Sequence, residues 1–109
     1  MVEMFIAMNR ITCSEEYRGR FEELFATRAK EVDKMPGFIE AKILRPVQDG
    51  KPYIIMTYWE AKEHFDEWVN SDAFRLGHTR GFKDIAQARK EGKEPPISSD
   101  MENYEVFAT

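Results

Sequence analysis

Residues 38–59, FIEAKILRPVQDGKPYIIMTYW, set the architecture of this chain. Two runs rich in β-branched and aromatic residues, 38–45 and 53–59, predict two strands. The Asp49-Gly50 pair between them is a strong turn signal and predicts an antiparallel hairpin. The middle of the chain is therefore expected to be a β-hairpin. The segments on either side of it predict the other strands and the helices of the fold.

A further strand is expected before the hairpin, over residues 3–12. Its side chains alternate between two faces, and Phe5, Ala7, Asn9 and Ile11 share one of them. The other face carries apolar residues as well, so both sides of this strand are expected to be covered.

A long helix is expected to follow this first strand. Thr12 or Ser14 is expected to cap this helix, and Thr12 with Glu15 fits a capping box, in which the two side chains satisfy free backbone N–H groups at a helix start. Apolar residues then recur at helical spacing as far as Met35. Pro36-Gly37 ends the pattern, so the helix is predicted to run from the capping box to Met35.

After the hairpin, the pattern predicts short helices and one more strand. Ser71-Asp72 is a favourable N-cap pair between two helical segments. Glycines and prolines are frequent in residues 81–100, which follow these segments. The elements expected are a helix over 61–70, a helix from Ser71-Asp72 to His78, a mostly irregular segment over 81–100 with one or two helical turns at 83–90, and a final strand over 102–108.

The order β-α-β-β-α-β predicts a ferredoxin-like α+β fold, a four-stranded antiparallel sheet with helices on one face, in a single domain spanning residues 1–109. The third strand is apolar on both faces, with Ile55 on one and Met56 on the other. The helices can cover only one face of the sheet, and a large exposed apolar face tends to bind another protein surface. We therefore expect a two-fold homodimer packed sheet to sheet, a dimeric α+β barrel.

Composition excludes several classes of protein. The formal net charge of −4 gives no electrostatic reason for nucleic-acid binding. No apolar run approaches the ~20 residues that span a membrane. Cys13 is the single cysteine, so no internal disulfide can form, and a cytoplasmic, reducing location is expected.

Three side chains stand out as candidates for chemistry: Asn9, Trp68 and His78. Asn9 is an amide on an apolar strand face, where buried amides need partners. His78 is one of two histidines, and a neutral imidazole can bind a metal. Each also has an ordinary interpretation: an amide satisfied by the backbone, an aromatic core residue, and a solvated histidine at a helix end. The residues alone leave both interpretations open.

Taken together, the run EWVNSDAFRLGH at 67–78 and MNRIT at 8–12 resemble the IsdG-type haem-degrading monooxygenases, within the antibiotic-biosynthesis-monooxygenase-like dimeric α+β barrel group. The resemblance implies His78 as the proximal iron ligand, Asn9 on the distal side and Trp68 packed against the porphyrin. It implies haem as cofactor and substrate, molecular oxygen, and an external electron donor such as a reductase. The expected products are iron and an open-chain tetrapyrrole.

A porphyrin is a flat apolar plate with two carboxylates, so its pocket needs apolar walls and basic groups at the rim. The wall candidates are Phe5, Ala7, Phe21, Phe25, Phe65, Val69 and Phe74, and the rim candidates are Arg10, Arg75, Arg80 and Lys83. Two alternatives stay open. One is a cofactor-independent monooxygenase acting on a quinol-like aromatic in the same pocket, and the other is a haem-binding dimer without turnover.

Overall fold

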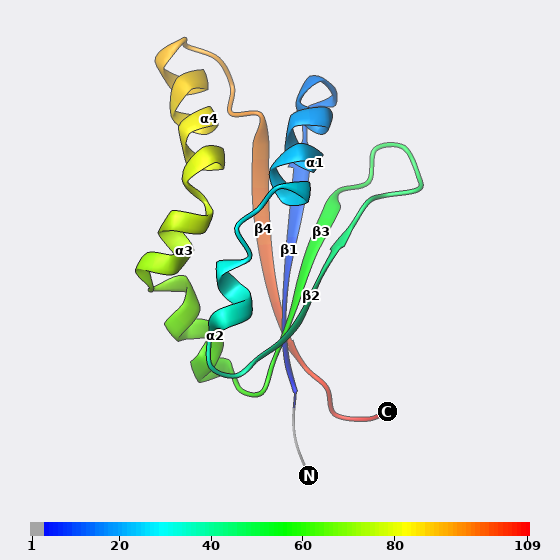
Figure 1. Cartoon of the computed structure of the whole chain (residues 1–109). Helices are drawn as coiled ribbons and strands as arrows, with labels where there is room; N and C mark the ends of the chain where they lie inside the picture. The colour runs from blue at the N-terminus through cyan, green and yellow to red at the C-terminus, as the bar shows by residue number, and fades with distance from the viewer. Residues whose placement is uncertain (1–3) are drawn as a thin grey trace.

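The computed structural model describes residues 4–109, and it confirms the predicted four-stranded antiparallel sheet (Figure 1). The strand order is β2-β3-β1-β4, with every neighbouring pair antiparallel. Residue 3, the first position of the predicted first strand, lies outside the described residues. The strands are β1 (Phe5–Cys13), β2 (Phe38–Leu44), β3 (Tyr53–Trp59) and β4 (Ile97–Glu105).

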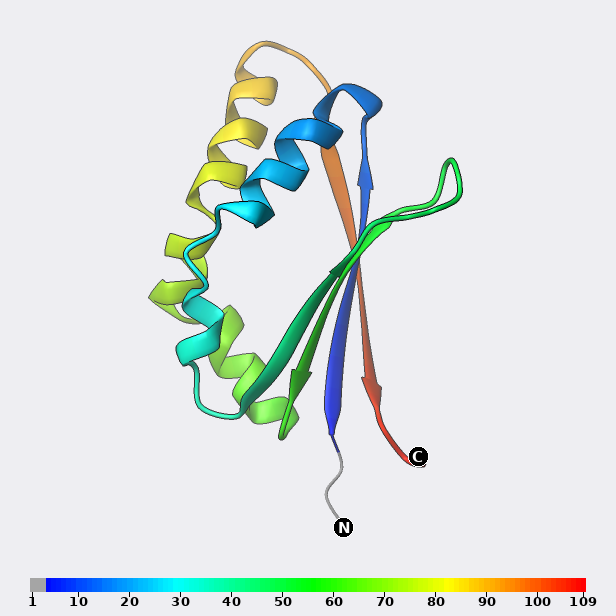
Figure 2. The same cartoon turned by 45° about the vertical axis from the view of Figure 1, so that its right-hand side comes forward.

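All the helices described lie on one face of this sheet, as Figure 2 shows, which confirms the predicted layering. They are α1 (Arg18–Ala26), α2 (Lys62–Val69), α3 (Asp72–Gly77) and α4 (Thr79–Lys90), with 3₁₀ turns at Glu15–Tyr17 and Glu31–Lys34. Within residues 4–109, no helix has both the length and the apolar character needed to cross a membrane.

The long first helix predicted from the sequence is wrong in its extent. Helix α1 ends at Ala26, and Lys30 has a left-handed backbone with φ of 55°. Residues 26–30 carry no large apolar side chain, so nothing in this stretch holds a helical turn against the sheet. The predicted capping box is also wrong, because Thr12 lies within β1. Ser14, the alternative cap, stands at the N-cap of the 3₁₀ turn Glu15–Tyr17, where its side chain makes no capping hydrogen bond.

The segment predicted to be mostly irregular instead contains α4, a twelve-residue helix with Gly81 in its first turn. Strand β4 begins at Ile97, earlier than predicted, and pairs with β1 along its whole length. Strand β4 is an edge strand with one neighbour, and most of its residues are polar. The alternation of apolar and polar residues that would predict a strand is therefore weak in this segment.

The expected cap of α3 is confirmed. The Ser71 side chain accepts a hydrogen bond from the Phe74 backbone N–H at 3.1 Å, which satisfies one of the free donors at the start of the helix. This bond fixes the point at which the chain turns from α2 into α3.

Two buried clusters hold the sheet and the helices together. Trp59, which is fully buried, lies in the larger cluster, and its indole N–H donates to Thr57 Oγ1 at 2.9 Å. The larger cluster comprises Phe5, Ala7, Val32, Trp59, Phe65 and Trp68, and the smaller one comprises Ile11, Phe21 and Tyr53. Side chains from both clusters line one cavity, which is partly open to solvent.

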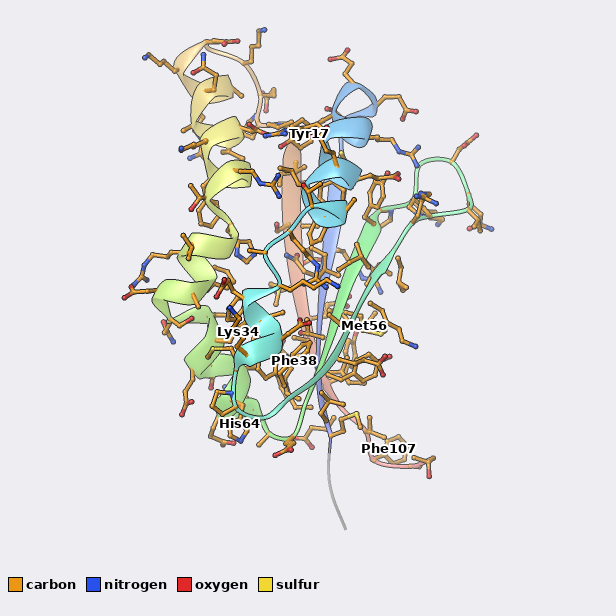
Figure 3. The ribbon with its side chains drawn as sticks, viewed as in Figure 1. Tyr17, Lys34, Phe38, Met56, His64 and Phe107 are labelled. Carbon is orange, nitrogen blue, oxygen red and sulfur yellow. The ribbon has the colours of Figure 1, made fainter. Side chains whose placement is uncertain are left out.

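The second face of the sheet is covered by none of the described helices (Figure 2). Met56, labelled in Figure 3, lies on this face with Tyr58, whose hydroxyl contacts the Met56 sulfur at 2.9 Å. Arg10 forms an ion pair with Glu102 on the same face. The second face therefore carries apolar side chains, as the sequence predicts, together with the ion pair of Arg10 and Glu102.

Candidate active site

A cavity of about 420 Å³ lies between the sheet and the helices. This volume is within the range of small-molecule sites. Apolar side chains dominate the lining, which includes Ala7, Asn9, Ile11, Phe21, Phe25, Phe65, Trp68, Val69, Phe74, His78, Phe82 and Ile85. The three candidate residues Asn9, Trp68 and His78 are thus brought to one space from a strand and two helical segments.

His78 stands at the joint between α3 and α4, as the last cap of one helix and the first cap of the next. Its ring Nδ1 lies 2.7 Å from the Phe74 carbonyl oxygen. A carbonyl oxygen only accepts, so Nδ1 donates and carries the hydrogen in this arrangement. The neutral ring then has its lone pair on Nε2, which is the form that binds a metal ion.

Aromatic rings fix the plane of the His78 ring. Phe74 stacks on it with ring centroids 4.0 Å apart and an angle of 27°, and Phe82 lies at 5.6 Å and 24°. Trp68 lies at 6.3 Å from the same ring and is itself buried. The imidazole is therefore held in one orientation before any ligand binds.

Asn9 lies in the middle of β1, opposite Ile55 of β3 and Met101 of β4. Its side-chain oxygen is buried and has no hydrogen-bond partner among residues 4–109. A buried polar atom without a partner costs about 1–3 kcal/mol. An amide maintained at this cost, on the wall of an apolar cavity, fits a site that a polar ligand group completes.

The other buried polar side-chain atom without a partner in the described residues is Nδ1 of His64. His64 lies on α2 against Gly37, outside the cavity lining (Figure 3). A Cβ at Gly37, which has a φ of +79°, would lie 2.2 Å from the His64 ring, so this contact needs glycine.

Residues 4–80 match the family model described as antibiotic biosynthesis monooxygenase. The chain belongs to that family. A heme oxygenase (staphylobilin-producing) from Staphylococcus epidermidis is 30% identical over 108 residues, which are 97% of this chain and 96% of the relative. The resemblance stated from the sequence is therefore confirmed at the level of the family.

Two comparisons with Mycobacterium tuberculosis proteins agree with this membership. A heme oxygenase (mycobilin-producing) is 42% identical over 59 residues, which span about half of each protein, 52% of this chain and 56% of the relative. The solved structure of the heme-degrader MhuD, with two hemes bound in its active site, has a TM-score of 0.69 and 27% identity, covering 96% of this chain and 97% of that one.

Most of the expected cavity wall of this family member is where the sequence predicts it. Six of the seven wall candidates line the cavity: Ala7, Phe21, Phe25, Phe65, Val69 and Phe74. Phe5 is the exception, because it packs beneath Phe65 with ring centroids 5.6 Å apart, inside the larger buried cluster. Its place at the end of β1 puts it in the core and off the cavity surface.

Most of the basic residues that were predicted at the rim of the pocket lie elsewhere. Arg80 lines the cavity, whereas Arg10 lies on the opposite sheet face with Glu102, so its prediction is wrong. Arg75 pairs with Asp72 at 2.6 Å and is not in the lining, and neither is Lys83. The lining residues that sequence analysis did not predict include Tyr17, Arg28, Lys30 and Phe82. No local signal marks them, because the 3₁₀ turn before α1, the loop after α1 and helix α4 bring them to the cavity.

Polar contacts join α4 to α1 and to the 3₁₀ turn that precedes α1. Tyr17, which Figure 3 shows between α1 and α4, donates its hydroxyl to Asp84 at 2.5 Å, and Arg20 donates to the same oxygen at 3.0 Å. Burial opposes ionisation of Asp84, but these hydrogen bonds outweigh it and lower its pKa. Burial and the contact with Asp84 raise the pKa of Tyr17. The helix that begins beside His78 is thereby fastened over the cavity.

Proposed function

We propose that this chain is a haem-degrading monooxygenase that binds haem as cofactor and substrate. It opens the porphyrin ring with molecular oxygen and external electrons, and releases iron and a linear tetrapyrrole. The proposal rests on the hydrogen bonding of the His78 ring. Its Nδ1 donates to the Phe74 carbonyl, so its Nε2 lone pair remains available in an apolar cavity.

The residues of the cavity fit haem. His78 is the group suited to bind the iron, since a histidine that binds a metal usually donates its second nitrogen to a carbonyl or carboxylate. When bound, haem supplies the iron that activates oxygen and the ring carbon that becomes oxidised. Arg28 and Arg80 line the cavity and are suited to meet the two carboxylates.

Asn9 and Trp68 have separate roles in this proposal. The side-chain oxygen of Asn9 has no protein partner in the described residues, so this amide is suited to hold a small polar reactant in otherwise apolar surroundings. Trp68 is 7% exposed and packs at right angles to Phe74, with ring centroids 5.3 Å apart. An indole this firmly held can press a flat ligand out of its plane, and distortion is one means by which a protein tunes haem.

The same proposal includes a homodimer and a cytoplasmic location. The sheet face that carries Met56 and Tyr58 has no described helix over it, and a second copy packed sheet to sheet would cover it. The relatives named above supply the substrate class, while the electron donor is inferred from the chemistry alone.

The test is to add haemin to the purified protein and record its visible spectrum, then to add ascorbate in the presence of catalase. We expect a Soret band that forms and then bleaches as iron is released. We expect His78→Ala to lose the ligated spectrum and His64→Ala, a matched change outside the cavity, to keep it. A stable band would favour a haem-binding protein without turnover, and no band would favour the quinol-type monooxygenase. An unchanged spectrum in His78→Ala would refute the ligand role.

A further inference from the structure

The outward side of α4 is positively charged, although the whole chain has a net charge of −4. Lys83, Arg89 and Lys90 are exposed, and no carboxylate of the described residues forms an ion pair with any of them. The one acidic residue of α4, Asp84, is turned toward Tyr17 and Arg20. The helix therefore presents a locally basic surface on an acidic protein.

An exposed aromatic ring lies within this surface and reaches the candidate iron ligand. Phe82 is 47% exposed, lines the cavity, and lies 5.6 Å from the His78 ring at an angle of 24°. Residues seven apart lie on one side of a helix, so Phe82 stands over Arg89, and Lys83 stands over Lys90. An apolar centre with a charged rim is the anatomy of a protein interface.

We propose that this basic surface of α4, formed by Phe82, Lys83, Arg89 and Lys90, docks an acidic electron-donor protein. The inference rests on the proposed function, which requires electrons from outside the chain. The donor would supply one electron to the ferric iron of a haem that His78 is suited to bind, giving ferrous iron, and no bond or proton would move. Charge complementarity selects this side, because the acidic remainder of the chain repels an acidic partner.

Two competing roles for the basic groups fit less well. Anchoring the haem carboxylates needs groups at the cavity, and Lys83, Arg89 and Lys90 are absent from its lining. Binding an anionic membrane surface needs a broad apolar helix face. Phe82 is the one exposed large apolar residue of α4, because Ile85 is partly buried.

The first experiment uses haem-free protein and an acidic plant-type [2Fe–2S] ferredoxin as the probe, titrated by calorimetry at low salt. We expect saturable binding that weakens with added salt. Lys83→Glu should weaken binding about tenfold, a typical effect of reversing a charge beside an interface. Lys51→Glu, the same charge change in the turn between β2 and β3, should stay within about twofold of the parent. Far-UV circular dichroism checks that both variants fold.

The second experiment loads the protein with haem and follows reduction of the iron by reduced ferredoxin in a stopped-flow instrument. We expect Lys83→Glu to slow this reduction, and to leave reduction by ascorbate, a small molecule that needs no docking, unchanged. If haem fails to bind, the proposed function fails while the calorimetric result still stands. The inference is overturned if ferredoxin does not bind, if Lys51→Glu weakens binding as much as Lys83→Glu, or if phosphatidylglycerol vesicles bind in a Lys83-dependent way and ferredoxin does not.

Discussion

Replacing Asn9 by leucine should make the ligand-free protein more stable and stop its chemistry. The Asn9 side-chain oxygen is buried without a partner, at a cost of about 1–3 kcal/mol. Leucine has a similar size and no polar atom, so Asn9→Leu removes that cost. For 109 residues, an unfolding entropy of about 2.1 cal/mol/K per residue means that each 1 kcal/mol raises Tm by about 4 °C.

We therefore expect Tm of the haem-free Asn9→Leu protein to rise by about 4–12 °C, and the urea midpoint to rise with an unchanged m-value. The matched control is Asn103→Leu. Asn103 lies directly opposite Ala7 on β4 but is exposed, so this variant isolates the strand preference of leucine. Its stability should change by about 0.5 kcal/mol or less.

The functional half of the prediction is measured on the same two proteins. Haem cleavage should slow strongly in Asn9→Leu and continue in Asn103→Leu. A less stable Asn9→Leu protein would show that the amide is satisfied and supports the fold, and would remove the case for a ligand partner. Equal stabilisation in both variants would show that strand preference explains the gain.

Three further predictions concern Trp68, Ser71 and Glu22. Trp68→Phe should keep haem binding but slow ring opening, which single-turnover spectra would reveal, and an undiminished rate would contradict the role of the indole. Ser71→Ala removes the bond to the Phe74 N–H and should cost about 1 kcal/mol in urea unfolding; no change would mean that the cap contributes nothing. Hydrogen bonds from Arg45 and a tyrosine lower the Glu22 pKa to about 2. Its stabilising effect is complete above the unfolded pKa of about 4.3 and is lost as pH falls through 2, so Glu22→Gln should flatten the stability profile across that window; an unaltered slope there would contradict the pairing.

The sequence predicts the parts of this fold that local chemistry controls. The hairpin follows from Asp49-Gly50, and the start of α3 follows from Ser71, because turn and cap residues act on their own backbone. Asn9, Trp68 and His78 line one cavity as expected, since the alternation along β1 and the helical spacing place each side chain on a known face.

The parts that sequence analysis misplaces depend on tertiary contacts. Helix α4 has few inward apolar residues, and it is fastened by Asp84 to Tyr17 and Arg20, which are distant in the sequence. Helix α1 ends at Ala26, and the left-handed backbone of Lys30 then starts the next 3₁₀ turn, although residues 26–30 contain no glycine that would indicate this break. The unpartnered state of Asn9 likewise depends on what three strands and the helices leave open around it.

Under the proposed function, the cavity lined by both buried clusters makes the stability of the protein depend on the substrate that fills it. A ligand that fills this cavity stabilises the folded state. At a free ligand concentration of 100 times Kd, binding raises the free energy of unfolding by about 2.7 kcal/mol. An enzyme that destroys such a molecule removes its own support in every cycle. Cellular proteases, which act on opened chains, would then clear idle copies first, and the amount of intact protein would follow the supply of what it consumes.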